Sequence, residues 1–250
     1  MTSKGLVVIT GASSGFGAAT ALRFAALGHP LYLGARRMDR LRQVAQMCRE
    51  KGAPSAEARP LDVRSKESID LFCAAAETPE ILLNNAGLAL GRDPVEKVKE
   101  EDLLGMVETN VIGLVRITRA FLPRMIAARR GHVINLGSYA ARGVYEGGAV
   151  YAATKHSVRV ISETLRLELS GTNIRVTEID PGLAETEFSI VRLGDQQQAK
   201  AVYQGMTPLS AEDVADAIVW AATRPAHVNV SELVLTPTAQ ASLTKVHRSS

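Results

Sequence analysis

The chain has few cysteines, the residues that cross-link small or secreted proteins through disulfides or metal sites. Its 250 residues include two cysteines, Cys48 and Cys73, which form no C-x-x-C pair and no cluster with histidine. We therefore expect neither a disulfide framework nor a metal site, and we interpret both side chains as inert thiols. Lone thiols of this kind favour a reducing, cytoplasmic location.

Charge of one sign and long apolar runs are also lacking. Lysine and arginine number 29 against 26 aspartates and glutamates, and this formal net charge of +3 is too small to indicate nucleic-acid binding. Residues 5–22 carry no charge, but glycine, serine and threonine interrupt them, so they predict no membrane span. They also lack the layout of a signal peptide. We expect neither nucleic acid nor a membrane as a partner.

The chain does have enough apolar residues for one full core, with 46% hydrophobic and 22% charged residues. Short β-rich runs alternate with stretches of helical spacing, and no linker or repeat divides them. This alternation predicts a single α/β domain over residues 1–250, with a doubly wound parallel sheet covered by helices on both faces. The expected strands are 6–9, 31–33, 81–83, 132–136, 174–179 and 232–235, and the expected helices are 18–26, 40–49, 66–76, 102–128, 149–170 and 211–223.

Three local features refine this prediction. Ser210 followed by Asp213 is the pattern of a capping box and predicts a helix start. Pro123 predicts a kink or a register shift near the end of the helix over 102–128. Residues 188–208 contain three consecutive glutamines and interrupt the alternation, so we expect a mobile, irregular insertion that forms a substrate loop.

A glycine-rich turn lies between the first strand and the first helix. Strand, glycine turn and helix in this order are typical of pyrophosphate binding, because backbone N–H groups at the helix N-terminus meet the phosphates. The spacing here is G-x-x-x-G-x-G, and a lone glycine pattern can also be an ordinary turn. The residues expected to cradle a cofactor are Gly11, Ser13, Ser14, Gly15, Phe16 and Gly17.

Two arginines follow the second expected strand. About 20 residues after such a loop, an acidic residue usually holds the ribose 2′-hydroxyl of NAD. Arg36 and Arg37 stand there instead, and two guanidinium groups can bind a 2′-phosphate through forked hydrogen bonds. The sequence therefore predicts NADP(H) rather than NAD(H). The alternative is two solvated arginines that open a basic helix.

Further polar residues stand where the expected strands and helices begin or end. Tyr151 and Lys155 are four residues apart and therefore share one helix face. Ser138 follows the apolar run 133–137, at the carboxyl end of a strand, where open α/β sheets bind ligands. Residues 84–87, Asn-Asn-Ala-Gly, end another strand in the same way.

These motifs together resemble the short-chain dehydrogenase/reductase superfamily over essentially the whole chain. The matching residues are Thr10, Gly11, Gly15, Gly17, the run 84–87, Ser138, Tyr151, Lys155, Pro181 and Gly182. The resemblance implies a Rossmann-type fold and an enzyme that transfers hydride between the nicotinamide C4 and a CH–OH or carbonyl group. It also implies a homotetramer, in which the helices over 102–128 and 149–170 pack against symmetry mates.

The resemblance further implies the catalytic roles. Tyr151 would exchange the hydroxyl proton, and Lys155 would favour its phenolate, since a free phenol has a pKa of about 10. Ser138 would hydrogen-bond the substrate oxygen, and Asn110 would orient a water that links Lys155 to solvent. Other implied cofactor contacts are Asp62 and Val63 at the adenine, Asn85, Ala86, Gly87, Pro181 and Gly182, and Thr186 at the nicotinamide carboxamide.

A closer resemblance is to the bacterial NADP-dependent 3-hydroxy acid dehydrogenases and to sulfoacetaldehyde reductases. It is carried by residues 84–91, 186–189, 191–192 and 225–230. It implies a small 3-hydroxy acid or its semialdehyde as substrate, such as serine, allo-threonine or 3-hydroxypropionate. Sulfoacetaldehyde, another small aldehyde or a bulkier neutral ketone stays as an alternative. A protein that senses NADP without turnover is the alternative of another class.

An acidic substrate needs a cation beside the hydride site. We expect Arg192 to clamp the anion, with Tyr145 as a second contact and Arg142 as an outside candidate. Alternatively, Arg192 is a surface residue paired with Asp195. Glu185 departs from the subgroup pattern, and it could repel an anion, hold a substrate amino group or face water.

Overall fold

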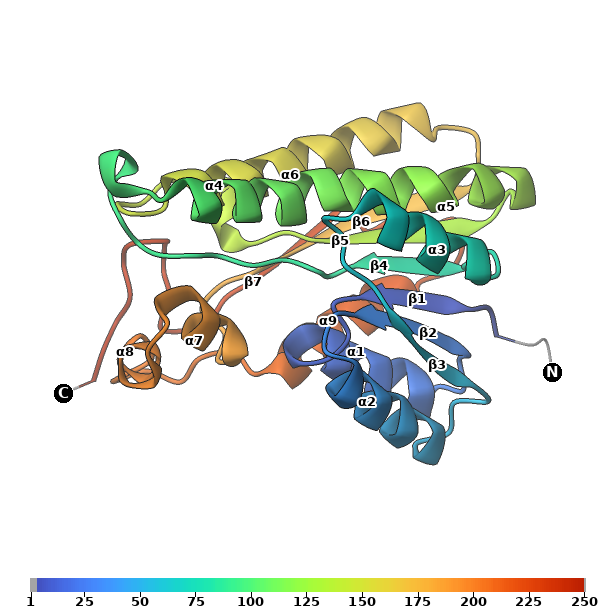
Figure 1. Cartoon of the computed structure of the whole chain (residues 1–250), viewed down its shortest axis with the longest axis horizontal. Helices are drawn as coiled ribbons and strands as arrows, with labels where there is room; N and C mark the ends of the chain where they lie inside the picture. Colours follow the sequence, from blue (N-terminus) through green and yellow to red (C-terminus); the bar gives the residue numbers. More distant parts are fainter. Residues whose placement is uncertain (1–3, 250) are drawn as a thin grey trace.

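The computed structural model describes residues 4–249, so residues 1–3 and 250 of the predicted domain lie outside the described part. Its centre is a parallel sheet of seven strands in the order β3-β2-β1-β4-β5-β6-β7 (Figure 1). The predicted doubly wound sheet is confirmed. The strands are β1 (Val7–Thr10), β2 (Leu31–Ala35), β3 (Ala56–Pro60), β4 (Ile81–Asn84), β5 (Gly131–Leu136), β6 (Ile174–Pro181) and β7 (Glu232–Leu235).

Helices cover both faces of the sheet, as Figure 1 shows. Because side chains alternate along a strand, Val7 and Ile9 enter one apolar core while Val8 enters the other. The first core lies under α1 (Gly15–Ala26), α2 (Met38–Glu50) and α9 (Ala211–Ala222). The second lies under α3 (Lys66–Ala75), α5 (Leu114–Ala128) and α6 (Ala149–Glu168), and α4 (Glu100–Val107) packs against α6.

Two elements differ from the prediction. Strand β3 was not predicted, because it is an edge strand of sequence AEARP with most side chains exposed, and it lacks an apolar run. The helix predicted over 102–128 is instead α4 and α5 joined by a π-helical turn, Glu108–Gly113. Pro123 lies inside α5, and the helix continues through it to Ala128.

The stretch predicted to be irregular contains two short helices, α7 (Glu187–Leu193) and α8 (Gln196–Ala201). The Thr186 and Asp195 side chains cap their N-termini, and Gly194, with φ of +67°, ends α7. These local caps, rather than an apolar stripe, build the helices, which is why periodicity missed them. The predicted capping box of Ser210 and Asp213 at the start of α9 is confirmed.

Both cysteines are buried and free, and burial raises the pKa of Cys48 to about 11 and of Cys73 to about 12. This agrees with inert thiols. Within residues 4–249, no three His, Cys, Asp or Glu side chains group in a way that could hold a metal. No helix in that range is long and apolar enough to cross a membrane.

Candidate active site

A cavity of about 570 Å³ opens at the carboxyl ends of the strands. It extends across the point where the chain passes from β1 to opposite sides of the sheet, since β2 and β4 both pair with β1. Of the predicted site residues, Gly17 and Asn110 do not line it. Those that do are Gly11, Ser13, Ser14, Gly15, Phe16, Arg36, Arg37, Asp62, Val63, Asn85, Ala86, Gly87, Ser138, Tyr145, Tyr151, Lys155, Pro181, Gly182, Thr186 and Arg192.

The glycine turn brings backbone close to the β4 end. Gly11 has φ of +68°, and a Cβ on it would lie 2.9 Å from the Ala86 Cα. The Asn85 Nδ2 donates to the carbonyls of Thr10, at 2.9 Å, and Gly11, at 3.1 Å. Gly17 serves packing instead, because a Cβ there would lie 2.5 Å from the Asn85 Nδ2. Glycine at position 11 therefore lets the backbone of the turn lie close to the backbone that follows β4.

The residues present fit a dinucleotide. Ser14, the N-cap of α1, makes no side-chain capping bond, so no capping side chain takes up the free N–H groups at this helix start. Gly15, with φ of +54°, would carry a Cβ only 3.7 Å from the Thr186 Cβ across the groove. Helix N-termini of this kind bind phosphate groups.

Arg37 forms an anchored cation beside the glycine turn. Its guanidinium donates to the hydroxyls of Ser13 and Ser14, and its Nη1 lies 2.9 Å from an oxygen of Glu187 on α7. Arg40 binds the other oxygen of Glu187, and hydrogen bonds from Arg37 and Arg40 hold the pKa of Glu187 below its usual range. Arg36 is exposed and lines the cavity. Sequence reasoning missed Glu187, which is 150 residues from Arg37.

Tyr151 and Lys155 project from α6 into the other end of the cavity, near Ser138. The Lys155 Nζ donates to the Leu136 carbonyl at 2.8 Å and lies 5.9 Å from the centroid of the Tyr151 ring. Burial raises the pKa of Tyr151 to about 12, although hydrogen bonding to Ser138 and the charge of Arg192 oppose this. Burial lowers the pKa of Lys155 to about 8. The phenol is therefore protonated at neutral pH unless further positive charge is brought near.

Asn110 lies behind the cavity wall, inside the π-helical turn. Its Oδ1 accepts from the Leu88 N–H at 2.9 Å, and its Nδ2 donates to the Leu88 carbonyl and to the Thr154 hydroxyl. A Cβ on Gly87 would lie 3.3 Å from the Asn110 Oδ1 and 3.7 Å from the Lys155 Nζ. Asn110 thus ties the loop after β4 to α6 beside Lys155. Wide π turns of this kind often occur at functional sites.

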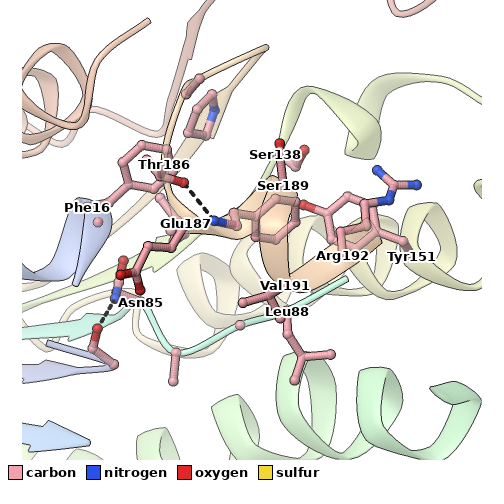
Figure 2. A pocket seen from close by; sticks show the side chains of 18 of the residues that line it. Phe16, Asn85, Leu88, Ser138, Tyr151, Thr186, Glu187, Ser189, Val191 and Arg192 are labelled. Carbon is pink, nitrogen blue, oxygen red and sulfur yellow. Dashed lines mark hydrogen bonds between the residues drawn. The ribbon is translucent and has the colours of Figure 1, made fainter. Parts of the chain in front are cut away.

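Arg192 extends from α7 to the end of the cavity that contains Tyr151, and Figure 2 shows the two side chains beside each other. Its Nε donates to the Gly91 carbonyl at 3.1 Å and its Nη2 to the Tyr145 hydroxyl at 3.1 Å. The guanidinium carbon lies 5.4 Å from the centroid of the Tyr151 ring. The alternative pairing with Asp195 is not found among the described residues, because that carboxylate accepts the Gln198 N–H.

The other residues considered from the sequence, Arg142, Glu185 and Thr186, differ in whether they line the cavity. Arg142 is bound to Asp180 and Glu232 and does not line the cavity. Glu185 is exposed and also does not line it, and its N–H donates to the Leu209 carbonyl. Thr186 lines the cavity, and its hydroxyl oxygen accepts a hydrogen bond from the Phe188 N–H at the start of α7.

Several lining residues had been given no role at the site from the sequence. They come from the loop after β4, from the α7–α8 segment and from the C-terminal stretch, which are joined only by the fold. They are Leu88, Arg92, Glu187, Phe188, Val191, Tyr203, Gln240 and Leu243. Of these, four had a signal, because they lie in the stretches 84–91, 186–189 and 191–192 that carry the closer resemblance: Leu88, Glu187, Phe188 and Val191.

Comparison with known proteins gives consistent matches. The model of the short chain dehydrogenase family matches residues 5–197. An NADP-dependent 3-hydroxy acid dehydrogenase of Salmonella typhi is 43% identical over 251 residues, covering 98% of this chain and 100% of that protein. Sulfoacetaldehyde reductase 2 of Chromohalobacter salexigens is 45% identical over 242 residues, covering 94% of this chain and 95% of that protein.

Solved structures agree with these matches. The closed form of serine dehydrogenase complexed with NADP+ superposes with a TM-score of 0.91 at 42% identity, covering 98% of this chain and 100% of that chain. Serine dehydrogenase from Escherichia coli superposes with a TM-score of 0.81 at 40% identity, covering 94% and 99%.

Proposed function

The chain belongs to the short-chain dehydrogenase family, and we propose that it is an NADP(H)-dependent oxidoreductase of a small 3-hydroxy acid or its semialdehyde. The substrate class follows from one observation above all. Arg192 holds its guanidinium 5.4 Å from the ring of Tyr151, so that a short anionic substrate can meet both groups at once. The relatives above are named for a 3-hydroxy acid, sulfoacetaldehyde and serine, which are small molecules that each carry a carboxylate or sulfonate group.

The proposed reaction uses the groups at the reacting end. Bound NADP+ supplies the hydride acceptor and a positively charged ring. Tyr151 takes the hydroxyl proton during oxidation and returns it during reduction, while Ser138 hydrogen-bonds the same substrate oxygen. Lys155, whose pKa is about 8, is mainly charged at neutral pH and favours the phenolate. Asn110 orients a water that links Lys155 to solvent.

The proposed cofactor contacts follow the length of the groove. Arg36 and Arg37 bind the 2′-phosphate, which selects NADP(H) over NAD(H). The glycine turn binds the diphosphate, and Asp62 and Val63 contact the adenine. The remaining contacts are Asn85, Ala86 and Gly87 along the ribose and nicotinamide, with Pro181, Gly182 and Thr186 at the carboxamide.

Initial rates of NADP+ reduction test the substrate class. Serine, 3-hydroxypropionate, isethionate and an uncharged alcohol of similar size are compared, and the best is repeated with Arg192→Ala. We expect an anionic substrate to be preferred, and Arg192→Ala to raise its KM by about 10 to 100-fold because a charged hydrogen bond is lost. Arg42→Ala is the matched control, since Arg42 pairs with Asp39 on the exposed face of α2. A preference for the neutral alcohol would contradict the proposal.

A second candidate is reduction of sulfoacetaldehyde, favoured by the 45% identical reductase. Sulfonate and carboxylate are both small anions that a guanidinium can bind, so the same site serves either. Rates with sulfoacetaldehyde and with malonic semialdehyde, measured with NADPH, distinguish the two. The higher kcat/KM identifies the better substrate.

We also propose a homotetramer in a reducing, cytoplasmic setting. Exposed apolar side chains on α4, the π turn, α5 and α6 support the oligomer, and two buried free thiols support the compartment. The exposed side chains are Leu104, Ile112, Val115, Val160 and Leu167. We further propose that residues 188–208 move to admit substrate, since α7 and α8 are short helices capped by single side chains.

A further inference from the structure

Four polar side chains lie in register across the sheet beneath α6. Asn84 on β4 is paired with Asn135 on β5, Asn135 with Glu178 on β6, and Glu178 with Glu232 on β7. The amide of Asn84 donates to Asn135 and Thr118, and Asn135 donates to Ser162. The fourth residue, Glu232, binds arginines at the sheet edge. This leaves Glu178 as the member whose role needs an explanation.

Glu178 is fully buried, and neither of its carboxyl oxygens receives a hydrogen bond from another described residue. An ionised carboxylate in that position would be strongly unfavourable. Asp180, two residues further along β6, lies on the same face of the strand. A Cβ on Gly137 would overlap the Asp180 Oδ1 and lie 2.7 Å from the Glu178 Oε1, so both carboxyl groups converge on this glycine.

Asp180 has the opposite environment. It is equally buried, but its Oδ1 accepts the Ser138 N–H at 2.9 Å and its Oδ2 accepts from the Arg142 Nε at 2.9 Å. The Arg142 Nη2 also lies 2.8 Å from that oxygen. Donors and a paired cation stabilise an ionised carboxylate. Within this pair, the proton therefore belongs on Glu178.

We propose that Glu178 and Asp180 are positioning residues for the reaction: Glu178, protonated, donates a hydrogen bond to the Asp180 carboxylate, and Asp180 holds Ser138 in place at the substrate oxygen. This inference deepens the proposed function and rests on it. Asp180 also immediately precedes Pro181 and Gly182, so its hydrogen bond to the Ser138 N–H joins two segments that both line the cavity.

The pair also sets the charge beneath the catalytic groups. Burial, with Asp180 next, raises the pKa of Glu178 to about 8. The charge of Asp180 opposes the lowering of the Lys155 pKa by burial and adds to the raising of the Tyr151 pKa by burial. When Glu178 ionises, a second negative charge appears on that side. The charged groups that face the pair are Arg142 from the turn after β5, Lys155, Arg159 and Arg166 from α6, and Glu232 from β7.

The first test is the pH dependence of alcohol oxidation with the best substrate found. Glu178→Gln keeps the shape and a donor but cannot ionise, so no second negative charge forms beside Asp180, whose own charge already contributes to the raised pKa of Tyr151. We expect the rising limb of log kcat against pH to move to lower pH by about half a unit or more. Glu100→Gln, a change at an exposed residue on α4, is the matched control and leaves the profile in place.

The second test separates positioning from folding. Asp180→Asn removes the carboxylate that holds Ser138, and we expect kcat to fall about 10 to 100-fold while the Kd for NADPH changes less than about twofold. NADPH fluorescence and thermal unfolding show whether the variant is folded. Asp216→Asn, at an exposed position on α9, is its control. An unchanged kcat in a folded Asp180→Asn would overturn the proposal.

A third readout needs no substrate and so distinguishes failure of this inference from failure of the proposed function. Infrared spectra of the wild type at neutral pH should contain the C=O band of a protonated carboxylic acid, which Glu178→Gln removes and Glu100→Gln retains. A wild-type spectrum without that band, or one in which Glu178→Gln leaves the band, would overturn the proposal. This readout also decides the matter if Asp180→Asn fails to fold.

Discussion

At the scale of single residues, burial shifts the pKa values of Tyr151 and Lys155, the two side chains proposed to be catalytic, in opposite directions. The pKa of Tyr151 rises to about 12 and that of Lys155 falls to about 8, because each loses hydration of its charged form. The pair is therefore a protonated phenol beside an ammonium at neutral pH. The charge of Arg192 opposes the rise in the pKa of Tyr151 that burial causes, so the residue proposed to bind the substrate anion also favours the proposed base.

Replacing Tyr151 with phenylalanine tests the proton transfer. We expect turnover to fall about 10³-fold, because the general acid–base group is lost. Binding of NADPH should persist, since the ring still packs near Phe188, 5.7 Å away between centroids. Steady-state rates measure turnover, and NADPH fluorescence titrations measure cofactor binding. Full activity in this variant would contradict the assigned role, and a wild type that binds NADPH but turns over nothing would favour the sensor alternative.

His132 on β5 predicts a particular sensitivity to acid. It is buried, its Nε2 contacts the Thr177 hydroxyl, and burial lowers its pKa to about 3. The unfolded chain therefore binds one more proton than the folded chain between pH 6.5 and about 3. From this residue, the free energy of unfolding should fall by about 1.4 kcal/mol per pH unit through that window.

Denaturant unfolding of His132→Gln across pH 4 to 7 measures this contribution. The variant is expected to be less stable at pH 7 yet to lose stability less steeply as the pH falls. Its comparison with the exposed His247→Gln separates the buried group from the general effect of acid. Equal slopes in all three proteins would show that His132 does not carry the acid sensitivity.

At the scale of elements, the short helix α7 links the two ends of the cavity. Glu187 in its first turn binds Arg37 and Arg40, and Arg192 in its last turn lies against Tyr145 and Tyr151 (Figure 2). A 2′-phosphate would have to share Arg37 with the Glu187 carboxylate. Each of these exposed ion pairs is weak, so competition with the phosphate should outweigh any loss of anchoring for α7.

Replacing Glu187 with glutamine should therefore tighten NADPH binding. We expect the Kd for NADPH to fall about threefold while that for NADH stays unchanged, because only NADPH carries the 2′-phosphate. Fluorescence titration with both nucleotides measures this. Glu185→Gln is a closely matched control, since it removes a charge two residues away that does not line the cavity. Weaker NADPH binding in Glu187→Gln would mean that anchoring α7 matters more.

At the scale of the whole molecule, several large apolar side chains on α6 and on the neighbouring π turn and α5 are exposed to solvent. Val160 and Leu167 lie seven residues apart on α6 and are 60% and 79% exposed. Residues at this spacing share one helix face, and Ile112 and Val115 add to the exposed apolar side chains of the neighbouring segment. Such a surface is expected to be covered by another copy of the chain.

Light scattering of the wild type should then give four times the 26.7 kDa chain mass. Val160→Glu with Leu167→Glu should produce a smaller species, because burying two unpaired carboxylates in an interface is unfavourable. Leu71→Glu on α3, also at a strongly exposed position, should leave the mass unchanged. A wild type that scatters as a monomer would refute the proposed tetramer.

The sequence by itself determined the layered sheet, the glycine turn and those site residues that lie within one short motif. These depend on short-range causes: alternation of apolar residues, backbone freedom at Gly11 and the four-residue spacing of Tyr151 and Lys155. Local patterns also failed in identifiable places. The exposed edge strand β3 has no apolar run that would predict it. The residue types of the π-helical turn at Asn110 do not distinguish it from an α-helix.

Only the tertiary structure decided which distant side chains meet. Arg37 and Glu187 are 150 residues apart, Arg192 and Tyr145 are 47 apart, and Ser138 and Asp180 are 42 apart. Parallel strands joined by helices bring their carboxyl ends to one edge, so residues from many crossovers face a single cavity. The pKa values follow from the same cause, because desolvation and neighbouring charges exist only once the chain has folded around them.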